Sequence, residues 1–187
     1  MKLNGLILAA GSSIRLGQPK QLVNFQGKSL LASTEEKLLS CCDQVYVVLG
    51  YEAHLFKTEI TSSQIIINQD WQQGMGNSLA YGSQIASQQA DGLLIALVDQ
   101  PLIPASHYQL MIDSFQQNPE FIIATEYQNS CGAPAIFPGL FFDDLLNCKN
   151  NDGAKNIIRN NATSSLTIRC EAAAYDIDSA IDLTKLS

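Results

Sequence analysis

Charged side chains are scarce in this chain of 187 residues: Asp, Glu, Lys and Arg make up 16% of it, and only two histidines are present. The five cysteines are odd in number and show no Cys-x-x-Cys spacing, which indicates neither a disulfide framework nor a zinc site and fits a reducing cytoplasm. No apolar run reaches the roughly 18 residues of a membrane-spanning helix. Hydrophobic residues make up 46% of the sequence, and no repeat or linker divides it, so we expect one globular domain over residues 1–187.

Acidic residues are missing from the start of the chain, where none precedes Glu35. The same segment carries Lys2, Arg15, Lys20 and Lys28, although the whole chain has a formal net charge of −7. The negative total argues against binding to nucleic acid. The local excess of cations predicts an anion site near the N-terminus, with chance clustering as the alternative.

Buried strands and amphipathic helices alternate along most of the sequence. Leu3–Ala9, Val45–Leu49 and Leu93–Val98 are continuous apolar runs of the kind found in parallel sheets. Further strands are expected over 65–67, 121–124, 135–137 (near a sheet edge), 166–168 and 173–177, and helices over 30–40, 77–88, 104–115, 141–146, 154–160 and 179–186. This alternation predicts a three-layer α/β fold with a mostly parallel sheet, in which ligands bind beyond the carboxyl ends of the strands.

The motif LAAGSSIRLGQPK runs from Leu8 to Lys20 and follows the first expected strand. Its small residues leave backbone N–H groups open to an anion, and Arg15 and Lys20 add two cations to the same loop. It is not a Walker A loop, and the chain lacks the GxGxxG of dinucleotide-binding oxidoreductases. The alternative is an ordinary Gly/Ser turn with two surface cations.

A second glycine-rich segment, QGMGNSLAYG over 73–82, precedes an expected helix. A helix N-terminus with a flexible approach suits phosphate, ribose or base contacts, whereas the alternative is a loop that merely caps the helix through Asn77 or Ser78. Trp71 stands beside this loop and suits a packing role and a stacking role equally.

Two acidic residues follow expected strands. Asp99 ends the apolar run of LVDQP, and an acid there costs free energy unless it pairs or holds a cation. Asp176 and Asp178 would point to one side of a strand, so Asp178 is a candidate second carboxylate for Mg²⁺. The alternatives are Asp99 as a turn residue and Asp178 as a helix cap.

Taken in order, these segments resemble the MobA-like nucleotidyltransferase family from residue 3 to about residue 183. Residues 8–20 look like its signature LAAGxSxRxGxxK, and GMGNSL, LVDQP, GAPAIF, DGAK and DIDSAIDL are similar to its later blocks. The closest branch is molybdenum cofactor cytidylyltransferase, because the guanylyl-transferring branch reads LAGG where this chain has Leu8-Ala9-Ala10-Gly11.

The resemblance implies a Rossmann-like nucleotidyltransferase fold and a Mg²⁺-dependent reaction in which molybdopterin attacks CTP and pyrophosphate leaves. It implies catalytic roles for Arg15, Lys20 and Asp99, with Asp99 and Asp178 as metal ligands. The implied nucleotide-binding residues are Leu8, Ala9, Ala10, Gly11, Ser12, Ser13, Gly74, Met75, Gly76 and Ser78. The implied acceptor-binding residues, in loops, are Gly132, Pro134, Asp152, Gly153 and Lys155. A molybdenum hydroxylase is the implied recipient of the product.

Two departures from the family pattern concern the acceptor: Ala133 stands where many relatives have histidine, and Asn151 stands where the GDxGA-like block begins with glycine. They leave nucleotide transfer intact and the acceptor's identity open. The alternatives are a guanylyl- or other nucleotidyltransferase of the same fold, and a non-catalytic accessory protein that delivers molybdenum cofactor.

Overall fold

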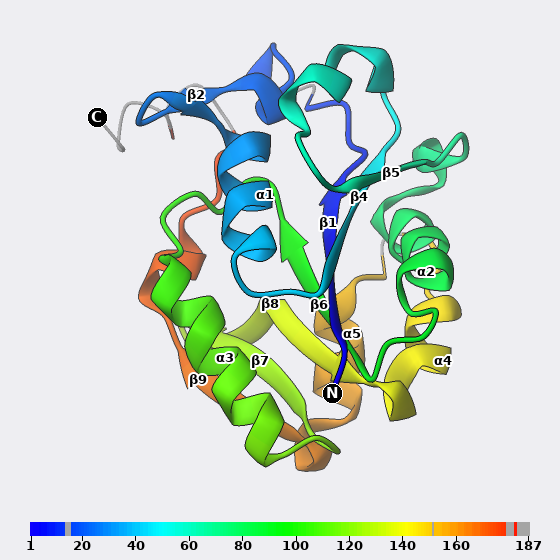
Figure 1. The fold of residues 1–187 in the computed structure, drawn as a ribbon, viewed down its shortest axis with the longest axis vertical. Coiled ribbons are helices and arrows are strands. Elements are labelled where there is room, and N and C mark those ends of the chain that lie inside the picture. Colours follow the sequence, from blue (N-terminus) through cyan, green and yellow to red (C-terminus); the bar gives the residue numbers. More distant parts are fainter. Residues whose placement is uncertain (14–15, 151, 179–181, 183–187) are drawn as a thin grey trace.

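The computed structural model describes residues 1–13, 16–150, 152–178 and 182 (Figure 1). A seven-stranded sheet runs through it in the order β5-β4-β1-β6-β8-β7-β9. All neighbouring strands are parallel except where β8 is a partner, which confirms the predicted mostly parallel sheet. The strands are β1 (Leu3–Ala9), β4 (Gln44–Leu49), β5 (Gln64–Ile67), β6 (Gly92–Leu97), β7 (Ile122–Tyr127), β8 (Ser130–Pro138) and β9 (Ser165–Arg169), and a separate hairpin pairs β2 (Asn24–Phe25) with β3 (Lys28–Ser29).

Helices cover both faces of the sheet, so the architecture has the three layers that the sequence predicts (Figure 1). On one face lie α1 (Leu30–Leu39) and α3 (Ala105–Gln117), and on the other lie α2 (Met75–Ala86), α4 (Phe142–Leu146) and α5 (Ala154–Asn160). Strand β1 is buried throughout: Ile7 joins the core beneath α1 and α3, whereas Leu6 and Leu8 join the core beneath α2. Burial on both faces explains why its sequence is continuously apolar.

Short 3₁₀ helices lie in several connections between these elements. They are Lys20–Leu22, Ala53–Leu55, Lys57–Glu59, Trp71–Gln73, Gly139–Phe141, Ala162–Ser164 and Glu171–Ala174. The first and the fourth of them border the site described below.

Strand β8 differs from its prediction in length and in place. It covers nine residues rather than 135–137, and it lies inside the sheet between β6 and β7 rather than near an edge. The prediction rested on Pro134 and Pro138, which lack the N–H that a central strand requires. The register shifts between Ala124 and Thr125, opposite Pro134, and Pro138 ends the strand, so neither proline interrupts a regular ladder.

The predicted strand over 173–177 is wrong. The segment begins as the 3₁₀ helix Glu171–Ala174 and continues without regular structure to Asp178. Its backbone pairs with the loop after β6 instead of a strand, because Ile177 N–H donates to the Asp99 carbonyl at 2.9 Å. The predicted helix over 179–186 lies outside the described residues except at position 182.

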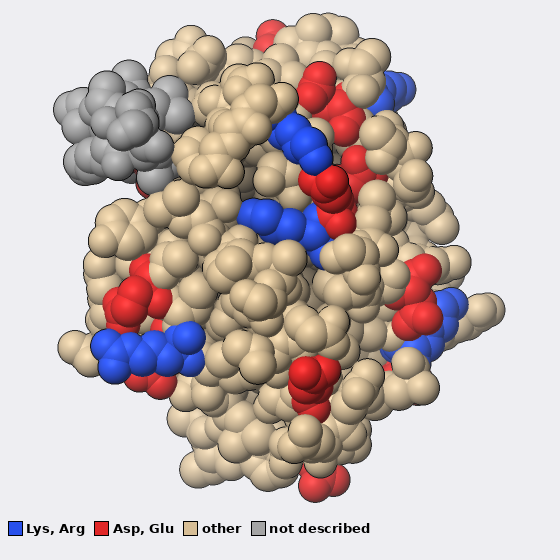
Figure 2. All heavy atoms as spheres, turned by 60° about the vertical axis from the view of Figure 1, so that its left-hand side comes forward, with Lys and Arg blue, Asp and Glu red and all other residues tan. Residues whose placement is uncertain are grey.

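Charges on the surface are dispersed. Figure 2 shows small groups of blue and red side chains on a mostly tan face. Exposed ion pairs of this kind are Lys28 with Glu36 at 2.6 Å and Arg169 with Glu171 at 2.8 Å. Among the described residues, no helix is long and apolar enough to cross a membrane.

Candidate active site

A cleft of about 640 Å³ opens at the carboxyl ends of β1 and β6. This is the edge at which ligands bind in open α/β sheets. Four segments that lie far apart in the sequence form its wall: the loop after β1, the approach to α2, the loop after β6 and the C-terminal segment. Its lining residues are Leu8 to Ser13, Lys20, Gln21, Trp71, Gln72, Gly74, Met75, Ser78, Leu97 to Asp99 and Asp178.

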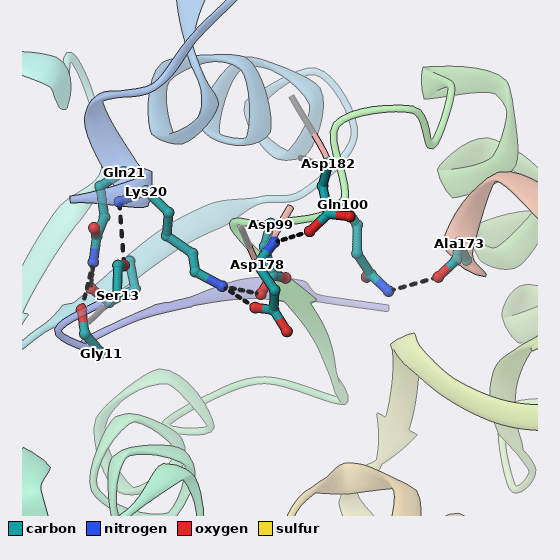
Figure 3. A network of polar contacts seen from close by, with 10 residues as sticks. Gly11, Ser13, Lys20, Gln21, Asp99, Gln100, Ala173, Asp178 and Asp182 are labelled. Atoms are coloured by element: carbon teal, nitrogen blue, oxygen red, sulfur yellow. Dashed lines mark hydrogen bonds and ion pairs between the residues drawn. The ribbon is translucent and has the colours of Figure 1, made fainter. Parts of the chain in front are cut away.

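The loop after β1 is held in place by hydrogen bonds with the 3₁₀ helix that follows it (Figure 3). The amide of Gln21, which is 1% exposed, donates to the carbonyls of Ala9 at 2.7 Å and Gly11 at 3.0 Å. Ser13 Oγ accepts a hydrogen bond from the backbone N–H of Lys20 at 3.1 Å. These bonds turn the loop's carbonyls toward Gln21, and the small side chains leave room in the cleft.

Lys20 joins two carboxylates from distant parts of the chain (Figure 3). Its Nζ lies 2.8 Å from Asp99 Oδ2 and 2.8 Å from Asp178 Oδ1. The side chains of Lys20 and Asp99 are mostly buried, at 15% and 19% exposure, whereas that of Asp178 is 41% exposed. The three residues therefore form one charged cluster at the wall of the cleft.

The C-terminal segment reaches this cluster because the loop after β6 binds it. Gln100 is buried, and its Nε2 donates to the Ala173 carbonyl at 3.0 Å. The bond from Ile177 N–H to the Asp99 carbonyl fixes the residue next to Asp178. Gln100 and Ile177 thus set the position of the second carboxylate relative to the first.

The pKa values of the cluster follow from burial and pairing. Burial lowers the pKa of Lys20, but the charges and hydrogen bonds of Asp99 and Asp178 outweigh it, and the net shift is upward from 10.5. Lys20 is therefore a cation at every physiological pH. Burial, together with the charge of Asp99, raises the pKa of Asp176 to about 6.

The cluster suits a divalent cation that also contacts phosphate. Asp99 Oδ1 is buried and accepts no hydrogen bond from any residue that the structure describes. Mg²⁺ in nucleotide sites takes one or two carboxylates and completes its shell with phosphate oxygens and water. A site made only of protein ligands is not present in the described part of the chain, where no three His, Cys, Asp or Glu side chains have a metal-binding arrangement.

The approach to α2 completes the cleft. Gly74 has φ 108°, a left-handed value that favours glycine, and it lets the chain turn into the helix. Asn68, buried after β5, donates to Asn77 at 2.9 Å and to Ser78 at 3.0 Å, so the first turn of α2 is tied to the sheet. Gly76 does not line the cleft. Its N–H donates to the Asn150 carbonyl at 2.8 Å.

The predicted acceptor residues do not share one pocket. Gly132 and Pro134 lie buried within β8 rather than in a loop, and Pro134 accepts a hydrogen bond from Thr125 Oγ1 at 2.7 Å. Asp152 and Gly153 line a second cavity, of about 540 Å³, which they share with residues of α4 and α5. Lys155 is exposed on α5.

Two predicted positions, Arg15 and Asn151, lie outside the described residues. Conversely, sequence reasoning missed Gln21 and Gln100. Gln21 directly follows Lys20, and Gln100 directly follows Asp99. An amide side chain next to a candidate catalytic residue is the signal from which they could have been found. Gln21 shapes the loop that carries Lys20, and Gln100 holds the segment that carries Asp178.

Comparison with known proteins identifies related sequences and folds. Residues 5–166 match the family model described as MobA-like NTP transferase domain. "Nicotine blue oxidoreductase" of Paenarthrobacter nicotinovorans is 37% identical over 103 residues, which are 53% of this chain and 50% of that protein. "Purine catabolism protein PucB" of Bacillus subtilis is 28% identical over 171 residues, which are 84% of this chain and 80% of that protein.

A relative named for molybdenum cofactor chemistry also matches. "Probable molybdenum cofactor guanylyltransferase" of Trichormus variabilis is 27% identical over 123 residues, or 66% of this chain and 58% of that protein. Among solved structures, an Rv0371c homologue from Mycobacterium sp. strain JC1 superimposes with a TM-score of 0.83 at 28% identity. That match covers 100% of this chain and 96% of the homologue.

Proposed function

Because the chain belongs to the family of MobA-like NTP transferases, we propose that it transfers CMP from CTP to the terminal phosphate of molybdopterin and releases pyrophosphate. The observation that supports this best is Lys20, held 2.8 Å from both Asp99 and Asp178 at the wall of the cleft. A cation and two carboxylates beside a loop of small residues suit a nucleoside triphosphate with its divalent cation.

In the proposed reaction, an oxygen of the terminal phosphate of molybdopterin attacks the α-phosphorus of CTP. A phosphorus–oxygen bond forms there, the bond from the α-phosphorus to the bridging oxygen breaks, and pyrophosphate leaves with that electron pair. The substrate phosphate is the nucleophile, so the protein contributes positioning and electrostatic stabilisation. Lys20 would stabilise the charge on the leaving pyrophosphate, and backbone N–H groups of residues 10–13 would line the triphosphate.

Asp99 and Asp178 are the residues that would hold Mg²⁺, which when bound neutralises charge on the phosphate oxygens. Two carboxylates at the wall of the cleft repel the phosphates of a triphosphate unless a cation lies between them. We therefore expect nucleotide binding to require a divalent cation. Lys20 would then turn from the carboxylates toward the phosphates.

The preference for CTP is proposed from the loop after β1. Ala10 lines the cleft at the position where the guanylyl-transferring pattern has glycine. A methyl group at this position leaves less room than a hydrogen atom, and we base the proposed preference for a pyrimidine over the larger purine on that difference.

Two other candidates follow from the relatives and from the fold. A non-catalytic accessory protein has no need of Lys20, Asp99 and Asp178 as one cluster, and their direct contact favours catalysis. An oxidoreductase is suggested by the name of the Paenarthrobacter nicotinovorans protein, of which the chain spans half. The absence of GxGxxG from the sequence argues against dinucleotide binding of the usual kind.

The direct test is a transfer assay with the purified protein, labelled CTP, molybdopterin and Mg²⁺. We expect one pyrophosphate released for each CMP attached to molybdopterin, slower transfer from GTP, and no release without molybdopterin. Absence of transfer from all four nucleoside triphosphates, with Mg²⁺ or Mn²⁺, would refute the proposed activity and favour the accessory role.

A further inference from the structure

Trp71 is an aromatic side chain in the wall of the cleft that the proposed reaction leaves without a role. It begins the 3₁₀ helix Trp71–Gln73 before α2, and it is only partly buried. One side of it packs against the apolar core between the sheet and α2. Another part lines the same cleft as Lys20 and Asp99.

The position of Trp71 is fixed by contacts with the end of β4. A Cβ added at Gly50 would lie 2.5 Å from Trp71 Cβ and 2.9 Å from the Ala10 carbonyl oxygen, so only glycine permits this approach. Tyr51 N–H donates to the same Ala10 carbonyl at 3.1 Å. The Tyr51 ring meets the indole edge to face, with 5.5 Å between ring centroids. Trp71 is therefore held rigidly beside the loop after β1.

The sheet separates Trp71 from the charged cluster by a defined distance. Trp71 lies against the end of β4, whereas Asp99 follows β6, and β1 runs between those two strands. Neighbouring strands are about 4.8 Å apart, so the two ends are about 10 Å apart across the loop that carries residues 10–13. The cleft thus has charged groups over β6 and an apolar aromatic surface over β4. A nucleotide has the same division between its phosphates and its base.

We propose that Trp71 is the base-binding platform, on which the base of the nucleoside triphosphate stacks while its phosphates lie at Lys20. This inference rests on the proposed function, because it assigns a role within the same nucleotide site. Stacking on an aromatic ring accepts every base, since each has a flat π face. Trp71 therefore supplies affinity, and the choice between CTP and GTP is made elsewhere in the cleft.

Trp71 is the only tryptophan in the chain, so its fluorescence reports on this position alone. Titration of the wild-type protein with CTP and Mg²⁺ should quench the emission, with the same dissociation constant as calorimetry gives. Inorganic triphosphate with Mg²⁺ has no base, so it should bind with little quenching.

Substitutions separate stacking from a structural role. Trp71→Leu should weaken CTP and GTP binding about 5- to 150-fold, the range expected for one stacked base, and leave triphosphate binding unchanged. Trp71→Phe keeps an aromatic face and should retain most of the affinity. Tyr81→Leu is the matched control, because Tyr81 is 43% exposed on α2 and does not line the cleft.

Three results would count against Trp71 as the platform, and they differ from failure of the proposed function. CTP affinity that is equal in wild type and Trp71→Leu, or CTP binding without a change in emission, would refute the inference while nucleotide binding stands. Equal losses of CTP and triphosphate affinity would assign Trp71 a structural role only. If the wild-type protein binds triphosphate and no nucleotide at all, the inference and the proposed function fail together.

Discussion

Lys20 is subject to two opposite effects on its charge, burial and pairing with carboxylates. The proposed function requires it to be charged, yet it is mostly buried, and burial alone would lower its pKa. Asp99 and Asp178 reverse that shift and keep the ammonium in place before a nucleotide arrives. The same pairing explains why a divalent cation is expected with the nucleotide: it would take over the carboxylates and release Lys20 toward the phosphates.

Removal of either charge should strongly reduce turnover without unfolding the protein. We expect Lys20→Met and Asp99→Asn each to lower kcat about 10²- to 10³-fold, the cost of one electrostatic group in a transition state. Steady-state pyrophosphate release measures the effect, and circular dichroism checks the fold. Lys28→Met is the control, because Lys28 is exposed and pairs only with Glu36 among the described residues. Full activity in either site variant would remove both residues from the proposed mechanism.

The residues of the cluster were predictable, but their contacts were not. Lys20 lies in a cationic loop, and Asp99 ends an apolar strand, so each was visible in the local sequence. In the sequence, Lys20 is 79 positions from Asp99 and 158 positions from Asp178, and no local pattern predicts a contact over such a separation. The prediction placed Lys20 on phosphate and the carboxylates on metal, and it did not foresee the direct ion pairs between them.

Among the secondary-structure elements, helix α1 holds a neighbouring loop through a buried polar side chain. Glu35 lies on the buried face of α1 and is 1% exposed. Its carboxylate accepts hydrogen bonds from the backbone N–H groups of Thr61, Ser62 and Ser63, at 2.9 to 3.1 Å. Burial raises the pKa of Glu35, but these bonds outweigh burial and bring it below its ordinary value of 4.5.

Because Glu35 accepts these hydrogen bonds as a carboxylate, we expect the free energy of unfolding to depend on pH. A lowered pKa stabilises the fold above pH 4.5, and that contribution is lost as the pH falls through the lower folded value. At pH 7, Glu35→Gln should lower the free energy of unfolding by about 1–3 kcal/mol. The difference from wild type should shrink below pH 4.5 in urea titrations. Glu36→Gln, at the exposed neighbouring position, should change it by less than about 0.5 kcal/mol. Equal stability of Glu35→Gln and wild type at pH 7 would contradict the stabilising role of the Glu35 carboxylate.

Helices and strands were predicted correctly where the local hydrophobic pattern determines them. They were predicted wrongly where a partner distant in the sequence determines the structure. Strand β1 and helix α1 follow from local pattern. Strand β8 was underestimated because Pro134 lies in an irregular part of the β7–β8 pairing, where Ala133 and Pro134 have no register partner in β7, and no local signal reveals this. The segment 173–177 was mistaken for a strand because its apolar side chains are buried in the core, as those of a strand would be, while its backbone bonds to the loop after β6.

For the whole molecule, the fold brings the candidate site together at one edge of the sheet. The order β4-β1-β6 brings the aromatic surface at Trp71, the loop of residues 10–13 and the charged cluster into one cleft. The chain carries a net charge of −7, so the cations of its first 34 residues stand out against an acidic protein. The α/β class and the position of the cleft followed from the alternation of strands and helices, whereas the acceptor region did not, because its residues are divided between β8 and a separate cavity.

The central claim is that this cleft binds a nucleoside triphosphate together with a divalent cation. Calorimetric titration of the purified protein with CTP, GTP, UTP and ATP, each with Mg²⁺ and with EDTA, tests it most directly. We predict binding in Mg²⁺, tightest for CTP, and a loss of affinity in EDTA of at least about tenfold, since without the cation the two carboxylates repel the phosphates. Binding of none of the four nucleotides in Mg²⁺, or equal binding in EDTA, would contradict the account.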